Sequence, residues 1–147
     1  MASNADRIER DAVRQRDLFD QLAFEVEADE AQLTDQARLA AVTGDPSHEI
    51  AYNHTLAAIG PVEQRLSRLK DNGAKEEELR SLEEGLRWAR TLQDEQKAAI
   101  DAIKRGDEIT AHKIVFGAEY ERELERVHFL LGRFRYMLDQ RSDRAIE

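Results

Sequence analysis

Apolar residues recur every three or four positions in four stretches of the chain, a spacing that places them along one face of an α-helix. The four stretches span residues 5–42, 46–72, 75–105 and 107–147. In the first stretch the apolar face consists of Ile8, Ala12, Phe19, Leu22, Val26, Leu33 and Ala40. No stretch alternates apolar and polar residues with period two, so no β-strand is expected. The pattern predicts an all-α chain.

Turn signals separate the four stretches. In Gly44-Asp45-Pro46, glycine can leave a helix through a left-handed conformation, aspartate can cap the next helix, and proline suits the first helical position. Gly106-Asp107 repeats the Gly-Asp signal, and Asn72-Gly73 ends the second stretch. The sequence therefore predicts tight reversals after the first and third helices, both at the same end of the molecule.

Two interruptions are expected inside the predicted helices. At Gly60-Pro61 the proline lacks an N–H group and clashes with the preceding turn, which predicts a kink or a short break. Phe116-Gly117 indicates a small offset after a short helix that ends at Val115. Four amphipathic segments joined by short turns favour an up-down-up-down four-helix bundle with long outer helices.

The length of 147 residues predicts a single domain over residues 1–147. Residues 1–5 include Ser3-Asn4-Ala5, which looks like a remnant of tag cleavage and suggests a fragment of a longer protein. No stop signal precedes Glu147, so both outer helices are expected to continue beyond the given sequence.

Polar residues interrupt the apolar faces in the half of the bundle nearest the two reversals. They are Asp29, Gln36, Gln93, Gln96 and Tyr120. The opposite half is lined by Phe19, Leu22, Leu66, Leu69, Leu79, Leu82, Leu131 and Phe134. Because a buried polar group without a partner costs about 1–3 kcal/mol, two interpretations arise. The polar residues satisfy one another, with or without water, as a layer that sets helix register, or they line a small polar cavity.

A second candidate surface lies on the outside of the first helix. If Phe19, Val26 and Leu33 face the core, the outermost stripe contains Asp17, Phe24, Ala31 and Arg38. An outward Phe and Arg on one stripe are either scattered surface residues or part of a contact with a second chain.

Composition excludes several classes of function. The net charge of −9 argues against general nucleic-acid binding, which needs clustered Lys and Arg. The chain has no cysteine, which excludes disulfides and zinc–thiolate sites but leaves the compartment open. No apolar run approaches the roughly 20 residues that span a bilayer.

Catalytic and metal-binding motifs are equally scarce. Glu125-x-x-His128 has the spacing used in carboxylate-bridged di-iron bundles, but those sites need a second such motif and two further Glu residues. The sequence also lacks a Gly-rich phosphate loop and a nucleophile elbow. No metal site, cofactor or enzymatic activity is therefore expected of this chain.

Several short motifs, in this order, resemble the extracytoplasmic four-helix-bundle sensory domains of bacterial transmembrane receptors. They are Ala37-Arg38-x4-Thr43-Gly44-Asp45-Pro46, Tyr52, Glu76-Glu77-x-Leu79, Ala98/Ala99-x6-Gly106-Asp107 and Val115-Phe116-Gly117-x2-Tyr120-Glu121. Such domains occur in sensor histidine kinases, chemoreceptors and diguanylate cyclases, and the similarity covers about residues 8–145.

The resemblance implies a periplasmic domain anchored to the inner membrane by flanking transmembrane helices. It also implies a side-by-side, parallel homodimer, and the outward stripe of the first helix provides Phe24 and Ala31 as the expected contact residues. Small ligands would bind in the half far from the membrane, inside one bundle or between two. Arg38 and Tyr52 are the ligand contacts that the resemblance implies.

Combined with the polar layer, the resemblance predicts a ligand-sensing domain, most simply that of a sensor histidine kinase. Arg recognises carboxylates through paired hydrogen bonds, so Arg38 with Tyr52, Gln93, Gln96 and Tyr120 would suit a small organic acid. Chemoreceptor or diguanylate cyclase output modules are alternatives. A soluble helical adaptor or oligomerisation module is the alternative from a different class.

Overall fold

The structure, a computed structural model, describes residues 3–146, with side chains through residue 140. Over this range the chain folds as α1 (Asn4–Thr43), α2 (Pro46–Ile59), α3 (Val62–Asp71), α4 (Glu76–Lys104), α5 (Glu108–Val115) and α6 (Ala118–Ile146). The described residues contain no β-strand. The all-α prediction is therefore confirmed.

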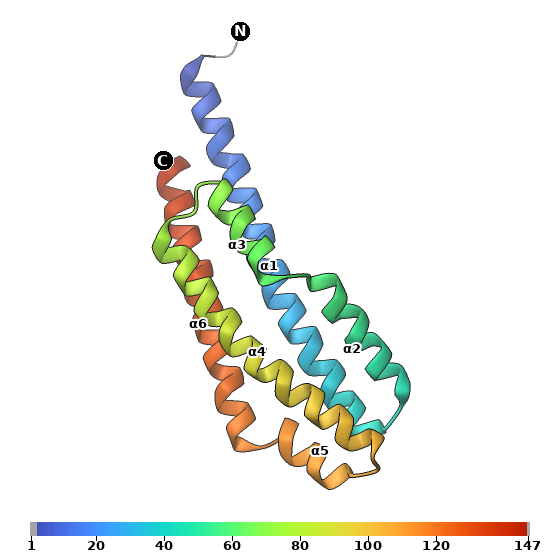
Figure 1. Cartoon of the computed structure of the whole chain (residues 1–147). Coiled ribbons are helices and arrows are strands. Elements are labelled where there is room, and N and C mark those ends of the chain that lie inside the picture. Colours follow the sequence, from blue (N-terminus) through green and yellow to red (C-terminus); the bar gives the residue numbers. More distant parts are fainter. Residues whose placement is uncertain (1–2, 147) are drawn as a thin grey trace.

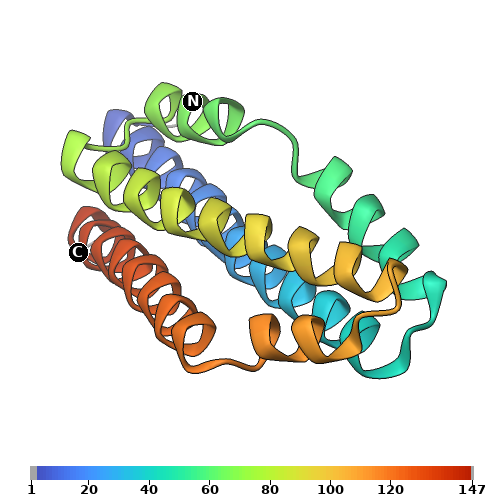
Figure 2. The same cartoon turned by 60° about the horizontal axis from the view of Figure 1, so that its bottom comes forward.

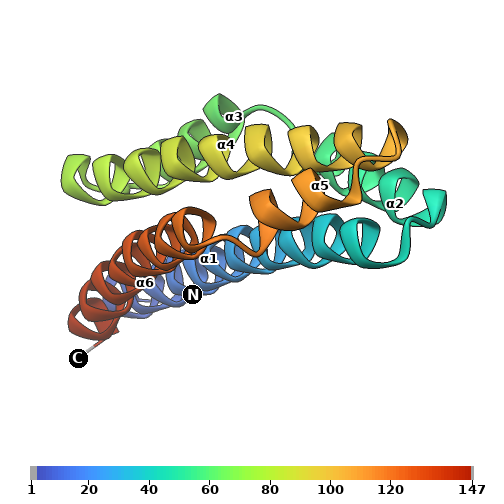
Figure 3. The same cartoon turned by 90° about the horizontal axis from the view of Figure 1, so that it is seen from below.

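Helix α6 runs antiparallel to α1 and α4, which run in the same direction as each other (Figure 1). Helix α1 contacts α2, α4, α5 and α6, and α4 contacts α3, α5 and α6 as well. Figure 3 shows α1 and α6 side by side in one layer, with α3 and α4 in a second layer above them. The α1–α2 and α4–α5 turns lie together at one end, as Figure 2 also shows. We call this end, with Gly44-Asp45 and Gly106-Asp107, the reversal end.

Local signals at the first reversal act as the sequence predicts. Gly44 has φ 69° and its N–H donates to the carbonyl of Ala40 (2.9 Å), and the Asp45 carboxylate accepts from the N–H of Ser47 (2.9 Å). Pro46 occupies the first helical turn, where no N–H partner is needed.

Helix α1 begins at Asn4, one residue before the predicted start, and side chains cap this end. The Ser3 hydroxyl accepts from the N–H of Asp6 (3.2 Å), and the Asp6 carboxylate accepts from the N–H of Ser3 (3.3 Å). This reciprocal capping box satisfies two helix-terminal donors. Ser3 is thus the cap of α1, and Asn4-Ala5 are its first residues, whereas residues 1–2 lie outside the described range.

The predicted second helix, residues 46–72, is two helices. Gly60 has φ 71° and Pro61 cannot donate to the helical ladder, so the helix stops at Ile59 and restarts at Val62. The break changes the packing partner: α2 lies on α1, whereas α3 lies on α4 (Figures 1 and 2). The short break predicted from the sequence is confirmed, but the single helix is wrong.

The last predicted helix, residues 107–147, is likewise divided, at the expected Phe116-Gly117 offset. A Cβ atom at Gly117 would lie 2.4 Å from the carbonyl oxygen of Lys113. Only glycine allows the chain to pass this close to the end of α5, so Gly117 positions α6 relative to α5.

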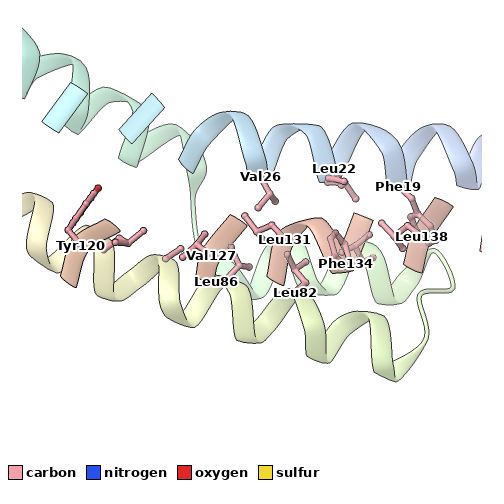
Figure 4. Packing of buried hydrophobic residues seen from close by; sticks show 14 residues of the cluster. Phe19, Leu22, Val26, Leu82, Leu86, Tyr120, Val127, Leu131, Phe134 and Leu138 are labelled. Atoms are coloured by element: carbon pink, nitrogen blue, oxygen red, sulfur yellow. The ribbon is translucent and has the colours of Figure 1, made fainter. Parts of the chain in front are cut away.

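Two buried clusters fill the interior. The leucine-rich core lies away from the reversal end, and Figure 4 shows its side chains interdigitating. It contains Phe19, Leu22, Ala23, Val26, Leu69, Leu82, Leu86, Ala89, Leu92, Tyr120, Val127, Leu131, Phe134 and Leu138, with Leu66 and Leu79 packed against it. Every residue that the sequence assigned to the apolar half is in this list.

The alanine-rich core lies nearer the reversal end. It contains Leu33, Ala37, Ala40, Ala41, Tyr52, Ala99, Ile100, Ala102, Ala111 and Val115. Small side chains let helix backbones approach closely, which is how α5 fits against α1 and α4 at this end.

Candidate functional site

Four buried polar side chains form a closed network where the two cores meet. The Tyr52 hydroxyl donates to Oε1 of Gln96 (2.8 Å), and Nε2 of Gln96 donates to the Tyr120 hydroxyl (2.9 Å) and to Oγ1 of Thr34 (3.3 Å). The Thr34 and Tyr120 oxygens are 3.1 Å apart. Gln96 is fully buried. We call Thr34, Tyr52, Gln96 and Tyr120 the polar network.

The polar network brings together three of the residues that the sequence predicted, and adds Thr34. Burial raises the pKa of the Tyr52 hydroxyl, and burial also raises the pKa of Tyr120 despite its hydrogen bonds to Gln96 and Thr34. Both tyrosines stay protonated and act as hydrogen-bond donors or acceptors at neutral pH. These four groups satisfy one another, so the first of the two interpretations holds for Gln96 and Tyr120.

Arg38 faces the interior junction rather than the outside. Its Nε donates to the carbonyl of Val115 (3.0 Å), and its Nη2 pairs with the Glu121 carboxylate. Its guanidinium carbon lies 5.3 Å from the ring centroid of Phe116 and 5.2 Å from that of Tyr120. The outward orientation predicted for Arg38 is therefore wrong, because the α5–α6 junction covers this side of α1. A ligand contact through Arg38 stays a prediction.

The remaining predicted polar residues separate into different environments. Asp29 pairs with Arg65 of α3. The Oε1 atom of Gln36 is buried with no hydrogen-bond partner among the described residues. Gln93 reaches the polar network through its main chain, since the Tyr52 hydroxyl lies 3.5 Å from its carbonyl oxygen. Gln93 also lines a cavity, and its side chain makes a hydrogen bond with the carboxyl of Glu30.

This cavity, of about 370 Å³, opens at the α2–α3 break, and we call it the break cavity. Its lining combines an apolar wall with charged groups. The lining residues are Glu30, Leu56, Ile59, Gly60, Pro61, Val62, Glu63, Arg65, Leu86, Arg90, Gln93 and Lys97. The volume lies within the roughly 300–1,000 Å³ typical of small-molecule pockets.

Two charged residues of the break cavity are buried, and neither was selected from the sequence. Glu30 is 3% exposed and Arg65 is 8% exposed. Burial raises the pKa of Glu30 to about 7, although attraction to Arg65 lowers it and Asp29 raises it further. The position of Glu30 in the sequence could have predicted its burial. Glu30 is four residues after Val26 and three before Leu33, and both of these residues are on the core face of α1.

A second group missed from the sequence joins α4 and α6. Carboxylate oxygens of Glu95, Glu119 and Glu123 lie within 4.8 Å of one another. Burial, followed by the hydrogen bond and charge of Glu123, raises the pKa of Glu95 to about 8. Glu119 and Glu123 are one helical turn apart, but only the α4–α6 packing brings Glu95 to them. The Glu125 and His128 of the di-iron-like motif are exposed on α6.

The outward stripe of α1 is exposed where the sequence placed it, apart from Arg38. Phe24 is 66% exposed and Ala31 is also exposed. On α6, Phe129 and Tyr136 are comparably exposed. The surface predicted for a second copy therefore remains accessible on the single chain.

Comparison of the chain with protein-family models, with curated proteins and with solved structures found no match. Among residues 3–146, no helix is both long enough and apolar enough to cross a membrane. The functional assignment consequently depends on the geometry of the residues themselves.

Proposed function

We propose that this chain is the extracytoplasmic ligand-sensing domain of a bacterial transmembrane receptor, with a histidine kinase as its output module. It binds a small carboxylate-bearing molecule and transmits a helix shift across the membrane. In this proposal the fold is an up-down-up-down four-helix bundle in which α2 and α3 together take the place of the second helix. The domain itself performs no catalysis.

The observation that carries the proposal is the break cavity beside the polar network. Buried charged groups inside a small all-α domain are costly unless they are paired, and Glu30 and Arg65 both line a cavity of ligand size. A bundle built only for assembly gains nothing from such a cavity. Binding supplies a reason to keep it.

The arrangement of the outer helices supports transmission of a signal. Helices α1 and α6 pack against each other, and their ends away from the reversal end lie at the same end of the molecule (Figure 1). Both ends can therefore meet one membrane surface. A ligand that favours one of two packings shifts the population of α1–α6 positions by its difference in affinity for them.

Ligand-dependent movement of α1 against α6 tests this proposal. The chain has no native cysteine, so spin labels can be attached at Asp11→Cys on α1 and Gln140→Cys on α6, both at exposed positions. Pulsed electron paramagnetic resonance should show a changed distance distribution when a small organic acid or amino acid binds. A control pair within α1, Asp11→Cys with Asp35→Cys, should keep its distance.

If compounds that raise the melting temperature leave the α1–α6 distance unchanged, sensing by helix shift is refuted. A soluble adaptor or oligomerisation module then becomes the better assignment.

Self-association as a parallel homodimer belongs to the same proposal, with Phe24 and Ala31 in the contact. Membrane tethering supplies a high effective concentration, so the isolated domain should dimerise only weakly. Phe24→Glu should reduce the dimer fraction in sedimentation velocity, while Phe129→Glu on α6 serves as the matched control. Equal dimer fractions for wild type and Phe24→Glu would exclude this stripe of α1 as the contact.

A further inference from the structure

Two buried groups of opposite charge at the break cavity each keep an atom without a hydrogen-bond partner. Arg65 uses Nη2 to pair with Asp29, but its Nη1 has no partner. The Oε2 atom of Glu30 has no partner either, although the Glu30 carboxyl interacts with the side chain of Gln93 through a hydrogen bond. As whole residues Glu30 is 3% exposed and Arg65 is 8% exposed, and both line the same cavity. Unpaired buried polar atoms destabilise a fold, so a donor and an acceptor are missing from this site.

The other residues that line the break cavity limit which ligand can supply the missing donor and acceptor. Leu56, Ile59, Val62 and Leu86 provide an apolar wall. Arg90, Lys97 and Glu63 are exposed at the rim, where water screens their charges. The buried interior therefore offers one free cationic donor, one free carboxyl acceptor and an apolar surface.

We propose that the break cavity binds a free amino acid with an apolar side chain. The ligand carboxylate accepts from Nη1 of Arg65, and the ligand ammonium group donates to Oε2 of Glu30. The side chain of the ligand lies against the apolar wall. This assignment deepens the proposed function and depends on it, because it names the ligand class of the same sensing domain.

Simpler ligands meet only part of the site. A carboxylic acid without an amine reaches Arg65 but leaves the Glu30 acceptor without a donor. An amine without a carboxylate reaches Glu30 but leaves Nη1 of Arg65 unpaired. A zwitterion satisfies both groups without adding net charge to the interior.

The site also touches the elements that must move. Glu30 belongs to α1, Arg65 to α3 and Gln93 to α4, the helices labelled in Figure 1. Residues of the α2–α3 break also line the cavity. The main chain of Gln93 lies against Tyr52 of the polar network. A ligand held between Glu30 and Arg65 therefore ties α1 to α3 at the position where α2 and α3 separate.

Isothermal titration calorimetry on the full 147-residue chain tests the ligand class. The probes are alanine, valine, leucine, isoleucine, methionine and phenylalanine, each with its deaminated acid and its decarboxylated amine. For leucine the matched compounds are 4-methylpentanoate and 3-methylbutylamine. At least one amino acid should bind, with both of its matched compounds roughly tenfold or more weaker, since each lacks one charged hydrogen bond.

Two substitutions locate the site on the protein. Arg65→Lys keeps a positive charge for Asp29 but removes the guanidinium fork, so it should weaken both the amino acid and its acid. Glu30→Gln should remove the preference for the amino acid over its acid, a change in selectivity that a purely structural role would not produce. The exposed Arg68→Lys and Glu9→Gln are the controls and should leave binding unchanged.

Each other outcome overturns the inference. Binding of an acid as tightly as its amino acid, unaffected by Arg65→Lys or Glu30→Gln, would exclude the break cavity as the ligand site, and the spin-label experiment with that acid would then decide the proposed sensing function. No binding by any probe would mean that water alone satisfies the buried atoms; the spin-label experiment with other organic acids then judges the proposed function separately. The probe comparison uses the wild-type chain, so it stands even if a variant fails to fold.

Discussion

The two cores of this molecule solve the same packing problem in different ways. The leucine-rich core fills the space between α1, α4 and α6 with large side chains such as Phe19 and Phe134. The alanine-rich core brings the helices together instead, with Ala37, Ala99 and Ala111 fully buried. The first region is built for stability through buried area. The second packs small side chains closely, and the polar network and the break cavity lie beside it.

The boundary between the cores is where the polar groups gather. Tyr120 belongs to the leucine-rich core and Tyr52 to the alanine-rich core, and Gln96 joins them. Just outside this network, Gly60-Pro61 separates α2 from α3 and leaves the break cavity. A change of packing mode thus coincides with the position of the polar residues.

The largest expected effect on stability comes from substitutions that test the difference between the two cores. Phe19→Ala should destabilise the fold by about 3–5 kcal/mol because it leaves a cavity among large neighbours. Ala37→Leu should destabilise it by about 1–3 kcal/mol through overpacking. Urea unfolding followed by circular dichroism measures both, with the exposed Phe24→Ala as the control. If Ala37→Leu is neutral, the alanine-rich core is looser than the structure indicates.

The next effect concerns the pH dependence of stability at Glu30. Its pKa is about 7 in the folded chain against 4.5 for an ordinary Glu. Between these values the folded state holds a proton that the unfolded state has lost, so the stability contributed by Glu30 falls as pH rises. The loss is complete above about pH 7 and amounts to about 3 kcal/mol.

Comparing wild type with Glu30→Gln from pH 4.5 to 8 isolates this group from Glu95, whose pKa is also raised. The stability of the wild type should decline more steeply with pH than that of Glu30→Gln. Parallel curves would show that Glu30 is not buried in this way.

A smaller effect is expected at the polar network. Gln96→Leu keeps the side-chain size but leaves the hydroxyls of Tyr52 and Tyr120 without their shared partner, at a loss of about 1–3 kcal/mol. Adding Tyr52→Phe to Gln96→Leu should recover part of this loss, because one unsatisfied hydroxyl is removed. Strictly additive losses in the double variant, measured by thermal and urea unfolding, would contradict a coupled network.

The smallest effect distinguishes a structural from a solvent-exposed Arg38. Arg38→Ala should destabilise the fold by about 1–2 kcal/mol, since it removes the bond to the Val115 carbonyl, the pair with Glu121 and the stacking on two rings. An exposed control such as Arg68→Ala should change stability by less than about 0.5 kcal/mol. An unchanged melting temperature for Arg38→Ala would restore the outward orientation that the sequence predicted.

The sequence alone determined the local features of this protein. Helix periodicity placed the apolar half, and Gly44, Asp45 and Pro46 determined the first reversal, because caps and left-handed glycines act within a few residues. Gly60-Pro61 predicted the break between α2 and α3 for the same reason. Gln96 and Tyr120 were predictable as members of one layer, since counting residues from the turns gives their height in the bundle, whereas Tyr52 was named only through the family resemblance.

Only the tertiary structure decided which side chains meet across helices. A heptad frame for a straight helix placed Arg38 outside, but the α5–α6 junction turns toward it and supplies its partners. Glu30 and Arg65 are 35 positions apart, and no local rule pairs them or leaves one atom of each unsatisfied. The relative position of Glu30 and Arg65 depends on the direction that α3 takes after Pro61. The packing of α3 on α4 determines this direction, and neighbouring residues in the chain do not.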